Sequence, residues 1–290
     1  MIVDRVVEKV HAFRVFVEEA SKVIKALEES TGLTIVPILY SPERYINARS
    51  TDSVYTVLRE LDHVDKLGVV LFSNGGDIDE AYILATYLQE LAQEKLVFFI
   101  PRYAKSAATI LALAGDEIVM LPVAELGPVD PVIYDLNTKR YIPLQSILEI
   151  LNLLSQRGLP GDLVKAILEK TPVLELGDYK RAVEHCAELC EKVLARRMFR
   201  NNPEKAREIA QKLVSYKQHT AAITLKDLLE LGVKARKATD NEAEYLWKLH
   251  QLWVEHIIEY EELIPSEAAK PVEFRLGKGL VLTITLSEII

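Results

Sequence analysis

The sequence predicts an α/β fold built around a parallel β-sheet. Apolar segments with strand character at 33–40, 66–73, 96–101 and 117–121 alternate with segments of helical period. This alternation is typical of parallel sheets whose strands are joined by right-handed crossovers. With 290 residues, the chain is long enough to bury a substantial core.

Boundary signals mark the helices of this predicted core. Asp52 is expected to cap one helix, and Asp77 with Glu80 fits a capping box for the next. Gly115 suits a left-handed helix terminus. The predicted helices are 2–29, 54–61, 78–93 and 107–114.

The pattern becomes helical after Pro143. Four glutamates of the last predicted helix, Glu255, Glu259, Glu261 and Glu262, are expected on a solvated face. Residues 272–287 alternate around a Gly-Lys-Gly turn, which predicts a β-hairpin. No linker separates two independent domains. The predicted helices are 144–154, 161–169, 179–199, 203–216, 225–231 and 242–263.

Composition excludes several classes of function. The net charge of −8 argues against nucleic acid as the main partner. Cys186 and Cys190 lie in one predicted helix and have no second ligand pair, so we expect two buried thiols and no metal site. The chain has neither a phosphate-loop motif nor a dinucleotide fingerprint, so no cofactor is expected. It also lacks a secretory signal and an apolar run of about 20 residues, which predicts a cytoplasmic protein with no membrane span.

Two turns of the predicted core carry the candidate site. Gly75 and Gly76 follow one strand and precede a helix, so backbone amides there can approach a developing oxyanion. Ser106 starts the helix after the next strand. Its hydroxyl is either a helix cap or a nucleophile, with the Ala107 amide as a second oxyanion donor. Those two roles are exclusive, since a capping hydroxyl is not free to attack.

These residues resemble the serine dehydrogenase proteinase family. Its wider clan holds the Clp protease proteolytic subunit, signal peptide peptidase A and the crotonases. The resemblance covers about Thr31 to Pro131, and a later segment, Thr224 to Val233, resembles the clan's terminal helix. Four motifs carry it in order: Ser73-Asn74-Gly75-Gly76-Asp77, Tyr103-Ala104-Lys105-Ser106-Ala107-Ala108, Gly115-Asp116-Glu117-Ile118-Val119-Met120 and Glu125-Leu126-Gly127-Pro128-Val129-Asp130-Pro131.

The resemblance implies a Clp–crotonase-like spiral of βαβ units with a helical insertion and a C-terminal hairpin. It also implies a serine peptidase-like hydrolase that acts on peptides or proteins through Ser106, and a homo-oligomer. The amphipathic first helix and the C-terminal hairpin offer apolar surfaces that a second subunit could cover. The expected regions are an N-terminal helix (1–30), the core (31–142), the insertion (143–215), a return to the core (216–240) and the C-terminal helix and hairpin (241–290).

The base that activates Ser106 is left open. The Clp protease carries a histidine at the place where this chain has Val129, with Asp130 beside it. His219 lies near the place of the Clp protease's third triad member, so it is one candidate base. The neighbouring prolines favour a structural turn at Asp130 over a role in orienting a histidine.

Two lysines are further candidates for the base. Some relatives of signal peptide peptidase A use a lysine downstream of the serine, which here suggests Lys139, although residues 137–140 read more like an exposed hairpin turn. Lys105 is expected to point away from Ser106, since adjacent side chains at a helix start diverge by about 100°. A catalytically inactive Clp-like scaffold or peptide-binding protein, and a crotonase-type thioester enzyme, are the alternative functions.

Overall fold

The computed structural model describes residues 2–135, 140–155, 159–170, 176–264 and 266–286. Within these residues a seven-stranded sheet has the order β10-β11-β1-β2-β3-β5-β9. All neighbouring pairs in it are parallel except β10 with β11. The mostly parallel α/β architecture predicted from the sequence is therefore confirmed. The strands are β1 (Thr34–Tyr40), β2 (Val64–Phe72), β3 (Ala92–Ile100), β5 (Glu117–Met120), β9 (Ala235–Lys237), β10 (Ala269–Leu276) and β11 (Gly279–Leu286).

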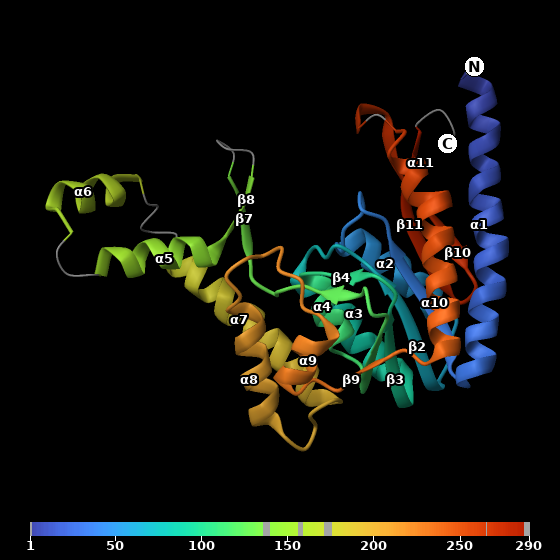
Figure 1. Ribbon diagram of the computed structural model, residues 1–290, viewed down its shortest axis with the longest axis horizontal. Coiled ribbons are helices and arrows are strands. Elements are labelled where there is room, and N and C mark those ends of the chain that lie inside the picture. The colour runs from blue at the N-terminus through green and yellow to red at the C-terminus, as the bar shows by residue number, and fades with distance from the viewer. Residues whose placement is uncertain (1, 136–139, 156–158, 171–175, 265, 287–290) are drawn as a thin grey trace.

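Two small sheets and the helices complete the described chain (Figure 1). β4 (Tyr103–Ala104) pairs with β6 (Glu125–Leu126), and β7 (Val132–Asp135) pairs with β8 (Arg140–Pro143). The helices are α1 (Ile2–Thr31), α2 (Ala48–Leu58), α3 (Ile78–Leu91), α4 (Ala107–Ala112), α5 (Leu144–Ser155), α6 (Gly161–Lys170), α7 (Leu176–Arg196), α8 (Pro203–Val214), α9 (Leu225–Leu231), α10 (Asp240–Trp253), the π-turn η1 (Val254–Ile258), α11 (Glu259–Glu261) and the 3₁₀ turn η2 (Ser266–Ala268).

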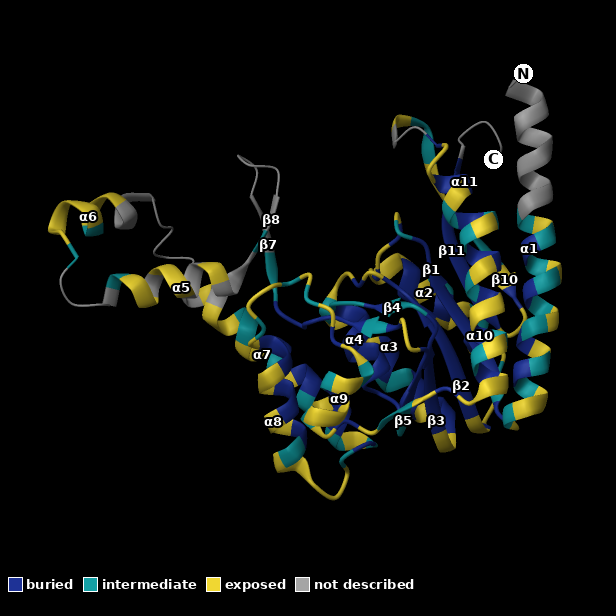
Figure 2. Cartoon of the chain, viewed as in Figure 1, coloured by how far each residue is buried: buried dark blue, intermediate teal, exposed yellow. Residues whose placement is uncertain are grey.

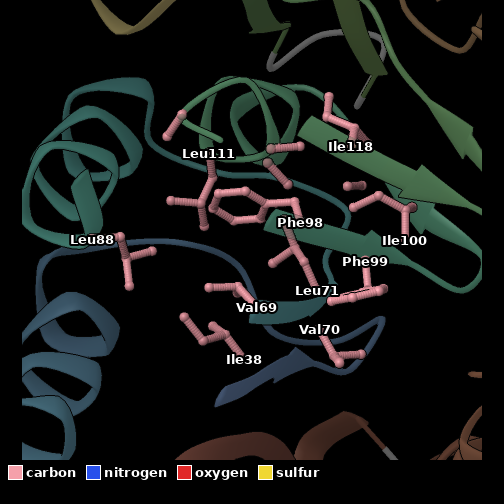
Figure 3. Close-up of a cluster of buried hydrophobic side chains, with 14 of the residues drawn as sticks. Ile38, Val69, Val70, Leu71, Leu88, Phe98, Phe99, Ile100, Leu111 and Ile118 are labelled. Atoms are coloured by element: carbon pink, nitrogen blue, oxygen red, sulfur yellow. The ribbon is translucent and has the colours of Figure 1, made fainter. Parts of the chain in front are cut away.

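Helices cover both faces of the sheet, so its central strands are buried almost throughout (Figure 2). Side chains alternate between faces along a strand. Leu71 of β2 and Phe98 of β3 lie with Leu88 of α3 and Leu111 of α4 (Figure 3). On the opposite face Phe72 stacks on Trp253 of α10, with ring centroids 5.5 Å apart. The apolar strands thus form one core between two helical layers.

Two predicted helix boundaries are wrong. Asn47, rather than Asp52, caps α2, because its side chain accepts a hydrogen bond from the Ser50 amide while the Ser50 hydroxyl accepts one from the Asn47 amide. Gly115 does not take the left-handed conformation after α4. Close packing accounts for that glycine instead, since a Cβ there would lie 3.0 Å from the Phe98 ring.

The last long helix contains a π-turn, which changes the face on which one of the four predicted solvent-facing glutamates lies. The extra residue in η1 shifts the helical register, so Glu261 turns inward and is buried. Its carboxylate accepts hydrogen bonds from the Thr283 hydroxyl and the Ile284 amide of β11. Burial raises the pKa of Glu261, and these two donors oppose that rise. The prediction that Glu261 lies on a solvated face was therefore wrong.

Buried polar contacts fasten the inserted helices to the core. Arg197, just after α7, donates hydrogen bonds to the carbonyls of Gln89 and Ala92 and to the Asp116 carboxylate. The Gln89 amide donates to the carbonyls of Ala114 and Val193. Because these donors and acceptors are largely removed from water, breaking them is costly. They hold α7 against α3 and α4, whose N-terminal ends carry the candidate site.

The two apolar surfaces that suggested an oligomer pack on their own chain. α1 lies against α10 and β10, and β11 pairs in parallel with β1 and antiparallel with the edge strand β10 (Figure 1). These elements therefore give no support for a homo-oligomer, which stays a prediction.

Candidate active site

The two candidate turns lie directly against each other. Ser73 receives a backbone hydrogen bond at its carbonyl from the Lys105 amide and donates one to the Tyr103 carbonyl. A Cβ added to Gly75 would lie 2.6 Å from the Lys105 carbonyl oxygen and 2.8 Å from the Ser106 Cβ. Only glycine therefore permits this approach, and the glycine turn and the serine turn form one unit.

Ser106 has a strained backbone that its role as a helix start does not require. Its φ of 52° and ψ of −124° make it the one non-glycine residue with positive φ in the described part of the chain. Such a conformation costs about 1–3 kcal/mol. The Ser106 hydroxyl makes no capping hydrogen bond, so the start of α4 does not occupy it. A sharp strained turn between a strand and a helix is also how other hydrolases present a nucleophilic serine.

The backbone amides around Ser106 differ in availability. The Gly75 amide donates to the Ser73 hydroxyl at 3.0 Å, so it is already engaged. In the described residues, none of the backbone hydrogen bonds between different elements has the Gly76 amide or the Ala107 amide as its donor. Gly76 and Ala107, rather than Gly75, are therefore the two available donors beside the serine.

His219 and Asp130 form a pair next to this unit. His219 Nδ1 lies 2.8 Å from Asp130 Oδ1, although 89 residues separate the two in the sequence. The Asp130 side chain is fully buried, whereas a quarter of the His219 side chain is exposed. With Nδ1 engaged by the carboxylate, Nε2 is the ring nitrogen left to exchange a proton.

Backbone hydrogen bonds bring the two segments of this pair together. Leu126 and Ile223 exchange a pair of antiparallel backbone hydrogen bonds, and the Val129 amide donates to the Leu213 carbonyl. The loop that carries His219 is thus tied at both ends to the segment that carries Asp130. The contact between His219 and Asp130 therefore depends on these backbone hydrogen bonds between the two segments, and not on the two side chains alone.

Two cavities meet at Ser106. The larger has a volume of about 700 Å³ and is also lined by Gly76, Asn74, Tyr45 and His219. The smaller, of about 240 Å³, is also lined by Gly76, Ala107 and Asp130. A ligand could therefore pass over the serine and reach both cavities.

Of the two candidate lysines, Lys105 lies within the described residues, and it does not join this arrangement. Lys139 lies outside the described residues. Lys105 Nζ lies 3.1 Å from Glu125 Oε1, and its stem packs beside Gly127. This ion pair holds the ammonium group toward β6.

Sequence reasoning weighed His219 and Asp130 separately and did not pair them. Asp130 stands beside Val129, the place where the Clp protease resemblance puts the base, and His219 stands near the place of the third triad member. Their contact brings a histidine and a carboxylate together near these two places. The histidine missing from position 129 was the available signal, since a carboxylate beside that place can orient a base delivered from elsewhere.

Thr109 is a buried residue beside the site that sequence reasoning missed. Its buried hydroxyl lies 2.9 Å from the Ala104 carbonyl and 2.8 Å from the Gly127 carbonyl, and it accepts a hydrogen bond from the Gly127 amide. It thereby joins the Ser106 turn to the strand that leads to Asp130. We expect Thr109→Val to lower the free energy of unfolding by about 1–3 kcal/mol in denaturant titrations, because buried polar groups lose their partner. Thr109→Ser, which keeps the hydroxyl, should recover most of that loss.

The described residues contain neither a candidate metal site nor a helix that could span a membrane. No group of three or more histidine, cysteine or acidic side chains in the described ranges is placed to hold a metal ion. Across the same ranges, each helix is too short or too polar to cross a bilayer.

Comparison with known proteins identifies the family. Two uncharacterized proteins of Methanocaldococcus jannaschii, MJ1495 and MJ0137, are 25% and 26% identical to this chain. Their alignments cover 78% and 77% of this chain, and 75% and 71% of the relatives. Two structures of a 1510-N membrane-bound stomatin-specific protease, both mutants and one with a substrate peptide, align with TM-scores of 0.44 and 0.43. They share 16% and 17% identity over 71% and 72% of this chain and 79% and 76% of theirs. The model of the ClpP-like SDH-type serine proteinases matches residues 3–272, and the chain therefore belongs to that family.

Proposed function

We propose that this protein is a serine peptidase that cleaves peptide bonds with Ser106 as nucleophile, His219 as general base and Asp130 as the residue that orients the base. One observation carries the proposal: the strained, uncapped Ser106 and the Asp130-bound His219 line the same cavity. A serine hydroxyl is a weak nucleophile unless a base lies near it. Membership of a serine proteinase family supports the same chemistry.

The proposed reaction begins when His219 Nε2 takes the proton of the Ser106 hydroxyl as Oγ attacks the peptide carbonyl carbon. The carbonyl oxygen becomes an oxyanion, and the Gly76 and Ala107 amides donate hydrogen bonds to it. The C–N bond then breaks, and His219 returns its proton to the departing amine. Water, activated by the same histidine, hydrolyses the acyl-serine and regenerates the hydroxyl. Asp130 keeps the Nδ1 proton in place and stabilises the imidazolium.

The pairing of His219 with Asp130 favours an enzyme over an inactive scaffold. The scaffold alternative rested on the absence of a histidine at the expected position, and His219 offers that group from another segment. A crotonase-type enzyme would need a basic pocket for a nucleotide. Among the described residues, no lysine or arginine lines either cavity.

Labelling with a fluorophosphonate probe tests the proposal. The wild-type protein should form a covalent adduct, and peptide mapping by mass spectrometry should locate it on Ser106. Ser106→Ala should abolish the adduct while leaving the circular dichroism spectrum unchanged. Failure of correctly folded wild-type protein to react would favour the scaffold instead.

A further inference from the structure

We propose that Arg44 is a positioning residue for the Gly76 amide, and that it acts by anchoring the loop of residues 41–46 to the C-terminal hairpin formed by β10 and β11. The inference rests on the proposed peptidase function, in which the Gly76 amide stabilises the oxyanion. It gives the hairpin, which takes no part in the proposed reaction, a role in holding the site.

The end of loop 41–46 contacts the glycine turn through its backbone. The Ile46 amide donates a hydrogen bond to the Gly75 carbonyl at 2.8 Å, and the Asp77 amide donates one to the Ile46 carbonyl at 2.8 Å. Ile46 thereby forms a parallel bridge with Gly76. A Cβ added to Gly76 would collide with both the carbonyl oxygen and the amide nitrogen of Ile46. Because the two backbones touch, a movement of Ile46 also moves Gly76.

The Arg44 side chain fastens this loop to both strands of the hairpin. It is 8% exposed. Nη1 donates to the Val272 carbonyl of β10 at 3.1 Å and to the Thr283 carbonyl of β11 at 2.9 Å. Nη2 donates to Glu273 Oε1 at 2.6 Å. Val272 and Thr283 are partners in the hairpin register, so one planar guanidinium spans the two strands.

The loop has little freedom between this anchor and the glycine turn. The Ser41 amide donates to the Leu282 carbonyl of β11 at 2.9 Å. The Arg44 amide donates to the Ser41 carbonyl at 3.0 Å, which closes a turn that contains Pro42. Proline restricts the backbone of such a turn. One residue separates Arg44 from Ile46, so a displacement of the anchor reaches the glycine turn.

Arg44→Ala is expected to lower kcat for peptide hydrolysis by about 100-fold. The substitution leaves two carbonyls and a carboxylate without their donor, so the loop should shift. A displacement of about 1 Å at a reacting group costs roughly 100-fold in rate. KM should stay within about threefold of wild type, because the Gly76 amide acts on the oxyanion rather than on the bound peptide.

A peptide aldehyde and the alcohol of the same sequence isolate the effect on the oxyanion. Ser106 Oγ adds to the aldehyde carbon, its proton passes to His219, and the aldehyde oxygen becomes an oxyanion. The alcohol binds without this step. Arg44→Ala should weaken inhibition by the aldehyde by about 100-fold and inhibition by the alcohol by less than about threefold. A loss of stability alone would not separate the two inhibitors.

Amide hydrogen exchange tests the same linkage without requiring activity. The Ile46 and Asp77 amides, which bond across the loop and the glycine turn, should exchange about tenfold faster or more in Arg44→Ala. Arg275 provides a matched control on β10, since its ion pair with Glu60, at 2.5 Å, is half exposed. Arg275→Ala should leave these exchange rates and kcat within about twofold of wild type.

Arg44→Lys separates geometry from charge. The lysine keeps the positive charge but lacks the planar fork that reaches both strands. We expect it to lower kcat by about tenfold, and it decides the question if Arg44→Ala does not fold. An Arg44→Lys protein with wild-type kcat and wild-type exchange would contradict the role given to the guanidinium.

The outcomes distinguish this inference from the proposed function. Arg44→Ala protein that keeps the wild-type kcat, or that loses aldehyde and alcohol inhibition equally, would overturn the role of Arg44 and leave the peptidase intact. Wild-type protein that does not react with the fluorophosphonate would overturn the peptidase. Faster exchange at Ile46 and Asp77 in Arg44→Ala would still support the hold of Arg44 on the glycine turn, and unchanged exchange would overturn it.

Discussion

Replacing His219 with alanine is expected to lower kcat for peptide hydrolysis by on the order of 10⁴-fold, because Ser106 then has no group to take its proton. Asp130→Asn should cause a loss of similar size. An amide at position 130 would no longer accept the Nδ1 proton, so the imidazole would present the wrong nitrogen to the serine. Both variants should also react more slowly with the fluorophosphonate probe. Initial rates on a fluorogenic peptide provide the measurement.

The same chain contains a second histidine–aspartate pair that serves as a control. His185 Nε2 lies 2.8 Å from Asp79 Oδ1, the same separation as in the His219–Asp130 pair. The His185 ring is nearly half exposed and lines neither cavity. His185→Ala should therefore change kcat by less than about tenfold, as expected for an exposed pair. Equal losses in the two histidine variants would contradict the role given to His219.

Gly75→Ala is expected to lower kcat by at least about a hundredfold, because the added methyl group displaces the serine turn. The new Cβ would lie within 2.6–3.1 Å of atoms of Lys105, Ser106 and Ala107. A displacement of about 1 Å at a reacting group costs roughly 100-fold in rate. The φ of 103° adds backbone strain that an alanine tolerates poorly. Steady-state kinetics and thermal denaturation should be measured on the same sample.

Gly32→Ala separates strain from displacement. Gly32 has a φ of 67°, and a Cβ there would meet nothing within 4 Å. This variant should lose about 1 kcal/mol of stability through left-handed strain and keep its kcat. A Gly75→Ala protein as active as Gly32→Ala would show that the glycine turn does not position Ser106.

The local sequence was sufficient to predict most elements of the core. Near-continuous apolar strands and helical periods located the four central strands, because each strand is buried on both faces. The sequence-based predictions were wrong where a tertiary contact determines which way a side chain points. The inward turn of Glu261 depends on a π-turn and on donors from β11, and no periodicity within its own helix encodes either.

The candidate site also contains residues that the sequence could predict and a contact that it could not. Ser106, Gly76 and Ala107 could be proposed from the sequence, since local turns after consecutive strands determine where they lie. The pairing of His219 with Asp130 could not, because hydrogen bonds between segments about 90 residues apart create it.

The sequence by itself thus determined the type of fold and the serine and glycine turns, whose geometry depends on neighbouring residues. Tertiary structure alone decided which carboxylate meets His219. The physical reason is that side-chain chemistry is local, whereas proximity between distant segments depends on how the whole chain packs.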